Sequence, residues 1–149
     1  MLLRGLPGSG KSPLDARMFA PYQFLHVEVD QHFVTNGVSR FDQARAADAH
    51  AAMTRDTLTA LQAGRRVEAA NIHVRFWEMA AAVGTAQLAG RSVGSVECGG
   101  RWTNVHSHAE TVLTAMGERC DRLPREFEGV SFQFKVALRC PCSSFAPTL

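Results

Sequence analysis

A stretch near the start of the chain, "RGLPGSGKSP" (residues 4–13), constrains the fold more than any other feature. Gly5, Gly10, Lys11 and Ser12 fill the spacing G-x-x-x-x-G-K-[ST]. Glycines at these positions let the backbone curl so that successive N–H groups point inward at an anion. Such a loop opens onto a helix, whose N-terminus adds positive potential. The stretch therefore predicts a phosphate-binding loop, preceded by the apolar, strand-like "MLLR" and followed by a helix.

The residues of this loop are expected to bind a nucleotide. The Lys11 amine is expected to reach the β- and γ-phosphates of ATP, and the Ser12 hydroxyl to bind Mg²⁺. A glycine-rich turn with a stray lysine is the alternative, and the strand-like and helical flanks argue against it. The predicted nucleotide-binding residues of the loop are Gly5, Leu6, Pro7, Gly8, Ser9, Gly10, Lys11, Ser12 and Pro13.

Pro13 follows the Lys-Ser pair directly and has no backbone N–H to offer to a phosphate. The first turn of a helix tolerates a proline, but Pro13 disfavours the helical backbone conformation for Ser12. A hydrogen bond to a charged group contributes roughly 1.5–3 kcal/mol. Its loss would weaken binding by about ten- to a hundred-fold. The sequence thus predicts a phosphate loop with weakened nucleotide affinity.

Length and composition bound the other possibilities. A chain of 149 residues can form one domain with a buried core, and its net charge of +2 is too small to indicate a nucleic-acid partner by itself. No apolar run reaches the length of a membrane span. The four cysteines match no disulfide or zinc framework, so a reducing, cytoplasmic setting is expected. We expect an ATP-binding domain over 1–138 and an irregular tail over 139–149.

Strand-like and helix-like segments alternate along the chain, which predicts an α/β fold with a parallel sheet flanked by helices. A long helical pattern carries apolar residues at helical spacings, and the segments with alternating or continuous apolar residues are short enough for strands. The predicted strands are 1–4, 24–29, 66–70, 92–98 and 130–136, and the predicted helices run from the loop to about residue 19, over 41–63, over 77–89 and near 110–120.

Five stretches, the first of which contains the loop, occur in a specific order. They are "LLRGLPGSGKS" (2–12), "HVEVDQHFV" (26–34), "FDQARAADAH" (41–50), "AANIHVRFWEM" (69–79) and "GGRWTNVH" (99–106). Together they resemble the bacterial and phage P-loop ATP-binding proteins related to the kinase half of polynucleotide kinases, often labelled AAA-type ATP-binding proteins. The resemblance implies a P-loop NTPase fold, ATP with Mg²⁺ as cofactors, and transfer of the γ-phosphoryl to a hydroxyl group.

Asp30 is expected to end the second strand, beside the first strand of the sheet. In open α/β sheets, ligands bind beyond the carboxyl ends of the strands. A carboxylate there could accept the proton of an attacking hydroxyl, the role of an acid at this place in the kinases that the chain resembles. Asp30 and Ser12 are also the predicted metal ligands. The alternative is an aspartate that only caps the segment after the strand.

Further candidates follow the third and fourth strands. Asn71 and Arg75 are predicted nucleotide-binding residues, although Arg75 could equally be a solvated arginine. Trp77 is expected to pack in the core rather than stack on a base. Ala70 stands where the resembling proteins often have an acid. Arg101 lies in the segment that corresponds to their lid and is a predicted catalytic residue, because an arginine there could stabilise the transferring charge.

Three functions remain open from the sequence. The first is a phosphotransferase that resembles the polynucleotide 5′-hydroxyl kinases. The second is a domain that keeps the nucleotide-binding fold and has lost the chemistry, which the departures at Pro13 and Ala70 favour. The third is a small-molecule or sugar kinase of the zeta-toxin type. The expected partners are a nucleotide and either a nucleic-acid 5′ end or a small hydroxyl compound, with no membrane.

Overall fold

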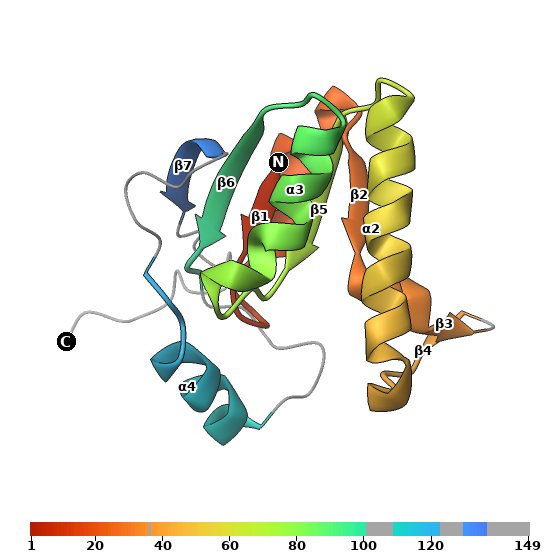
Figure 1. The fold of residues 1–149 in the computed structure, drawn as a ribbon. Helices are drawn as coiled ribbons and strands as arrows, with labels where there is room; N and C mark the ends of the chain where they lie inside the picture. Colours follow the sequence, from red (N-terminus) through yellow and green to blue (C-terminus); the bar gives the residue numbers. More distant parts are fainter. Residues whose placement is uncertain (36, 101–108, 123–129, 137–149) are drawn as a thin grey trace.

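The computed structural model describes residues 1–35, 37–100, 109–122 and 130–136. Within them, five strands form one sheet in the order β2-β5-β1-β6-β7 (Figure 1). They are β1 (Leu2–Arg4), β2 (Leu25–Glu28), β5 (Val67–Asn71), β6 (Val93–Cys98) and β7 (Val130–Val136). Every neighbouring pair in this sheet is parallel, so the carboxyl ends of the strands lie along the same edge. The predicted parallel α/β fold is confirmed.

Helices cover both faces of the sheet. The helices of the described residues are α1 (Lys11–Met18), α2 (Ala46–Gln62), α3 (Ala80–Leu88) and α4 (Glu110–Glu118), with short 3₁₀ helices η1 (Ala20–Tyr22), η2 (Val29–Phe33), η3 (Gln43–Arg45) and η4 (Phe76–Met79). In Figure 1, α2 and α3 lie across one face of the sheet. They pack on Leu2 and Ala69, whereas Leu14 of α1 packs on Leu3 and Ala70 on the opposite face. The molecule therefore has three layers.

The order of the strands corrects one expectation. β2 was expected beside β1, but β5 lies between them and pairs with both. The second strand also ends at Glu28, and Asp30 lies in η2 rather than at a strand end. The cause is a capping box: Glu28 is the N-cap of η2, and the Gln31 side chain accepts a hydrogen bond from the Glu28 N–H at 3.5 Å. The chain therefore turns into a helix before it reaches Asp30.

Helix starts and one hairpin also differ from the expectation. The helix expected from residue 41 begins at Ala46, because the Asp42 side chain accepts from the Ala44 N–H at 2.9 Å and forms η3 first. Between η2 and η3, β3 (Val34–Thr35) and β4 (Val38–Ser39) form an antiparallel pair that the pattern did not predict. These segments lie at the carboxyl edge of β2, near the expected ligand side of the sheet (Figure 1).

No helix in the described part of the chain is both long enough and apolar enough to cross a membrane.

Candidate functional site

The predicted phosphate loop, which we call the P-loop (residues 5–12), lies at the carboxyl end of β1 and leads directly into α1. Gly8 and Gly10 have φ values of 76° and 96°, in the left-handed region that favours glycine. The Ser9 N–H donates to the Leu6 carbonyl at 3.0 Å, which closes the turn. Because the first N–H groups of a helix have no partner within the helix, the start of α1 directs donors toward the loop.

Gly5 is required by a close approach to the neighbouring strand. A Cβ atom at Gly5 would lie 2.8 Å from the Cys98 carbonyl oxygen and would also collide with the Ser9 hydroxyl. The carbonyl belongs to the backbone at the end of β6 and cannot turn away as a flexible side chain would. The first glycine of the motif therefore lets the loop pack closely against the sheet, in addition to letting an anion approach the backbone.

Gly5→Ala is expected to lower the free energy of unfolding by about 1–3 kcal/mol, because the added methyl overpacks the contact with Cys98. Gly84→Ala is the matched control: Gly84 lies within α3 and its Cβ would meet no atom within 4 Å. That change should raise the free energy of unfolding by about 0.5–1 kcal/mol, since alanine favours the helix. Urea denaturation of both variants measures the difference. Equal stability of the Gly5→Ala variant and the wild type would contradict this packing.

The Lys11 side chain folds over the P-loop. Its Nζ donates to the carbonyl oxygens of Gly5 at 2.7 Å and Leu6 at 3.1 Å. Burial lowers the pKa of the Lys11 amine, and the charges of nearby groups, which include Glu28 and Asp30, act in the opposite direction. The amine thus lies within the loop that the motif predicts to hold the phosphates, with carboxylates of the β2–η2 segment close enough to influence its charge.

Ser12 and Pro13 are the second and third residues of α1. Ser12 is exposed, so its hydroxyl is accessible at the mouth of the loop. Ser12 lies within α1 although the proline after it disfavours a helical backbone at Ser12. The hydrogen bond from the Leu14 N–H to the Gly10 carbonyl, at 3.1 Å, and the rest of α1 outweigh this effect of the proline. Pro13 does not break the helix, as expected for the first turn.

Asp30 lies at the same edge of the sheet as the P-loop, two strands away. β5 separates β2 from β1, and neighbouring strands are about 4.8 Å apart, so the two backbones are about 10 Å apart. Asp30 is partly buried, which fits a carboxylate that faces a site rather than bulk solvent.

Asn71 and Arg75 lie at the end of β5 and just beyond it. Asn71 is paired in register with Arg4, so it borders the P-loop, and its Oδ1 accepts from the Ile72 N–H at 2.8 Å. Arg75 Nη1 donates to Asp121 Oδ1 at 2.7 Å, and this bond lowers the pKa of the Asp121 carboxyl. In this conformation Arg75 therefore joins η4 to the segment that follows α4.

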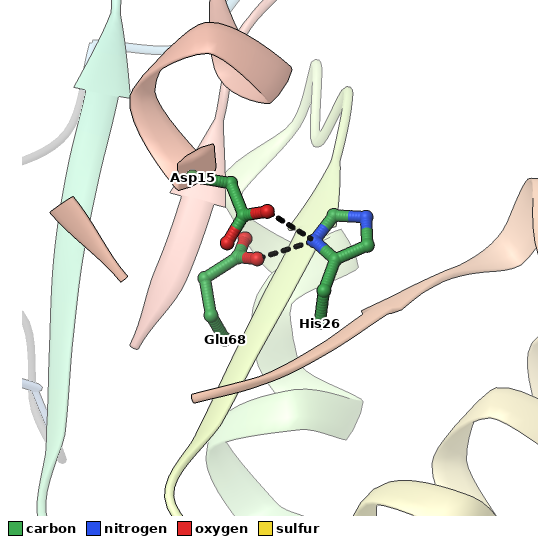
Figure 2. Close-up of side chains that lie close together, drawn as sticks. All are labelled: Asp15, His26 and Glu68. Carbon is green, nitrogen blue, oxygen red and sulfur yellow. Dashed lines mark hydrogen bonds and ion pairs between the residues drawn. The ribbon is translucent and has the colours of Figure 1, made fainter. Parts of the chain in front are cut away.

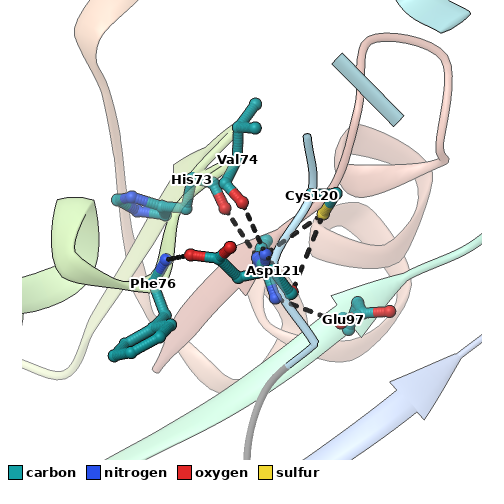
Figure 3. Close-up of polar contacts among 7 residues, drawn as sticks. His73, Val74, Phe76, Glu97, Cys120 and Asp121 are labelled. Carbon is teal, nitrogen blue, oxygen red and sulfur yellow. Dashed lines mark hydrogen bonds and ion pairs between the residues drawn. The ribbon is translucent and has the colours of Figure 1, made fainter. Parts of the chain in front are cut away.

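Arg4, which the sequence did not single out, is buried and connects several segments around the site. Its side chain is fully buried at the end of β1, and its Nε donates to the His73 carbonyl at 2.6 Å. Nη2 donates to the carbonyls of Val74 at 2.9 Å and Asp121 at 2.7 Å, and Nη1 lies 3.3 Å from Glu97 Oε2 (Figure 3). One guanidinium thus connects β1, the segment after β5, β6 and the segment that follows α4. An arginine in the strand-like "MLLR" was the only signal for it in the sequence.

A second polar cluster, of which only Glu68 is fully buried, joins α1 to the sheet. His26 of β2 faces Glu68 of β5, with His26 Nδ1 and Glu68 Oε2 2.5 Å apart, and Asp15 of α1 lies on the same side (Figure 2). Hydrogen bonds with Glu28 and Glu68 raise the pKa of His26 to about 10. Burial raises the pKa of Glu68. The His26 ring thus lies among three carboxyl groups, those of Asp15, Glu28 and Glu68.

The prediction for Trp77 needs a correction, and the structure does not describe Arg101. Trp77, expected in the core, is 69 % exposed, because η4 turns its side chain outward while Met79 is fully buried. The packing expectation for Trp77 was wrong. Arg101 falls outside the described residues, as does the predicted tail over 139–149. The nearest described link to the Arg101 segment is the Gly100 N–H, which donates to the Ser9 carbonyl of the P-loop at 3.0 Å.

Comparison with solved structures finds kinases. A protein described as a kinase from Chloroflexus aurantiacus matches with a TM-score of 0.68 at 16 % identity, over 95 % of this chain and 89 % of that one. A sugar kinase from Janibacter matches with a TM-score of 0.56 at 12 % identity, over 93 % and 83 %. The APS kinase of Mycobacterium tuberculosis, in complex with AMPPNP and APS, matches with a TM-score of 0.52 at 17 % identity, over 90 % and 86 %.

The chain has a P-loop kinase fold. These identities are low, so the likeness establishes the architecture and leaves the substrate open. No family model matches the sequence, and no curated protein does.

Proposed function

We propose that this protein binds ATP with Mg²⁺ and transfers the γ-phosphoryl group to a hydroxyl acceptor. The observation that carries the proposal is the placement of Lys11 in a closed P-loop with Asp30 at the same edge of the sheet. Phosphoryl transfer needs positioning and charge stabilisation more than covalent chemistry, and this edge offers both. The kinase fold of the structural neighbours supports the same class of reaction.

Each residue would have a separate role in the reaction. Lys11 neutralises phosphate charge, and Asp30 accepts the proton of the acceptor hydroxyl. The acceptor oxygen forms the new bond to the γ-phosphorus while the bond to the β-phosphate oxygen breaks, and ADP leaves. The Ser12 hydroxyl and the Asp30 carboxylate are oxygen ligands of the kind that Mg²⁺ prefers, so the residues fit that ion. When bound, Mg²⁺ would neutralise charge on the phosphates.

We further propose that the acceptor is a small hydroxyl compound rather than a polynucleotide 5′ end. Two of the structural neighbours are by name a sugar kinase and an APS kinase, which act on small molecules. The net charge of +2 provides no strong electrostatic attraction for a nucleic acid.

A panel of acceptors tests this function directly. The protein is incubated with γ-labelled ATP and Mg²⁺ together with sugars, sugar acids, nucleosides and an oligonucleotide that carries a 5′-hydroxyl. We expect label on a small hydroxyl compound. Label on the oligonucleotide alone would contradict the proposed acceptor class. ATP binding without transfer to any acceptor would favour the domain that has lost its chemistry, for which Pro13 and Ala70 are the specific observations.

Pro13→Thr is expected to tighten ATP binding by roughly ten-fold, equal to about 1.4 kcal/mol. The change restores an N–H and a hydroxyl to the third residue of α1, where the start of the helix favours an anion. Pro21→Thr is the matched control, because Pro21 lies in η1, outside the P-loop, and should leave the affinity unchanged. Calorimetric titration with ATP–Mg²⁺ measures both. Unchanged affinity in Pro13→Thr would mean that position 13 does not face the nucleotide.

A further inference from the structure

The cluster that joins α1 to the sheet brings together three side chains from three different elements. Asp15 comes from α1, and His26 and Glu68 are paired residues in the register of β2 and β5. His26 Nδ1 lies 2.5 Å from Glu68 Oε2 and 3.8 Å from Asp15 Oδ2. The possible ligand atoms of the three residues all lie within 4.8 Å of one another. Figure 2 shows the three side chains converging on one point.

Two carboxylate oxygens at this point have no hydrogen-bond partner among the described residues. They are Asp15 Oδ1 and Glu68 Oε1, and both atoms are buried. Glu68 is fully buried, so bulk water does not reach its second oxygen. An ionised carboxylate only accepts hydrogen bonds, and a buried acceptor that is left unsatisfied destabilises the folded state. A positive species between the two carboxyl groups, either a proton or a metal ion, would remove this destabilisation.

The surroundings of His26 favour a metal ion in this place. Its Nδ1 faces the two carboxyl groups, and its Nε2 lies 3.4 Å from Glu28 Oε2. Metal-binding histidines commonly donate their second ring N–H to a carboxylate, which fixes the tautomer and orients the ring. Glu28 is in position to accept that hydrogen bond while Nδ1 binds an ion. The cluster thus contains both the ligands and the supporting carboxylate.

We propose that Asp15, His26 and Glu68 bind a divalent first-row transition-metal ion of the Zn²⁺ type, at a site separate from the nucleotide. An imidazole ligand suits such ions, whereas Mg²⁺ prefers oxygen ligands alone. Zinc binds nitrogen and carboxylate oxygen at about 2.0–2.2 Å, which small side-chain rotations within this cluster can reach. The ion takes the place of any proton on His26 Nδ1 and of any proton held between the two carboxyl groups, and these protons are released to solvent.

The position of the site suggests what the ion does. Asp15 lies one helical turn after Lys11 on α1, and the other two ligands belong to β2 and β5. The ion therefore joins the helix that follows the P-loop to the strands that lead toward Asp30 and Asn71. We expect it to stabilise the fold and to hold α1 in place, with no contact to the substrate.

Titration of the full chain with Zn²⁺ after chelator treatment tests the proposal, with Mg²⁺ as the comparison ion. We expect one Zn²⁺ per chain, higher thermal stability with Zn²⁺, and no displacement by excess Mg²⁺. His26→Gln and Asp15→Asn should weaken Zn²⁺ binding at least ten-fold, and Glu28→Gln, which keeps all three ligands, by about ten-fold. His32→Gln is the matched control, because His32 also pairs with a carboxylate, Asp56, at 3.7 Å. That change should leave Zn²⁺ binding unaltered.

The Co²⁺-loaded protein provides a readout that does not depend on the variants folding. A site made of His26 and two carboxylates should show no thiolate-to-cobalt charge-transfer band, whereas binding at cysteines would show one. Such a band, failure to bind Zn²⁺, or equal Zn²⁺ affinity of the wild type and a folded His26→Gln variant would each overturn the proposal. A proton would then occupy the point between the carboxyl groups. None of these readouts depends on kinase activity, so this test and that of the proposed function can fail separately.

Discussion

Lys11→Ala is expected to abolish the thermal stabilisation of this protein by ATP. A ligand at a hundred times its Kd stabilises the folded state by about 2.7 kcal/mol, and this gain should vanish when the P-loop amine is removed. The amine lies over the loop, 2.7 Å from the Gly5 carbonyl oxygen and 3.1 Å from that of Leu6. It is the positive side chain that the motif directs to the phosphates, and charge-assisted bonds to phosphate are among the strongest polar contacts.

The same change should affect the stability of the nucleotide-free protein less. The alanine removes two hydrogen bonds to loop carbonyls, but it also removes the cost of burying the amine, which lowers its pKa. Arg17→Ala is the control: it removes a positive charge from the exposed last turn of the same helix. Thermal unfolding at several ATP concentrations compares the three proteins. Equal shifts for Lys11→Ala and the wild type would end the assignment of this loop as a phosphate site.

Asp30→Asn is expected to lower kcat for phosphoryl transfer by about 10²–10⁴-fold while ATP affinity stays within a few-fold. The proposed role of Asp30 is to accept the proton of the acceptor hydroxyl, which matters in the transition state and not in the binding of ATP. An asparagine keeps the size of the side chain and cannot accept that proton. The position of Asp30 at the sheet edge that carries the P-loop is the observation behind the prediction.

Asp48→Asn is the control for Asp30→Asn, because Asp48 is an exposed acid in the first turn of α2. Its kcat should equal that of the wild type. The measurement is transfer of the γ-phosphoryl to the acceptor found by the panel, together with ATP titration of each variant. A wild-type kcat in Asp30→Asn would show that another group, or none, takes the proton.

The sequence by itself determined the parts of this protein that depend on neighbouring residues. The P-loop is a contiguous motif, and its conformation follows from the glycines at positions 8 and 10 and the helix that starts at Lys11. The strands and helices followed from apolar periodicity, since burial of one face repeats every two residues in a strand and about every 3.6 in a helix. Their parallel arrangement followed from the alternation of the two types.

Only the tertiary structure decided which distant residues meet. Periodicity does not say that β5 inserts between β1 and β2, because strand order depends on how the connecting helices pack on the two faces. That insertion sets the distance from the P-loop to Asp30 and pairs His26 with Glu68. The contacts of Arg4 with groups about 70 to 117 residues away likewise exist only in the folded chain. The chemistry of a single residue can be predicted from the sequence around it, whereas its contacts with distant residues are set by long-range packing.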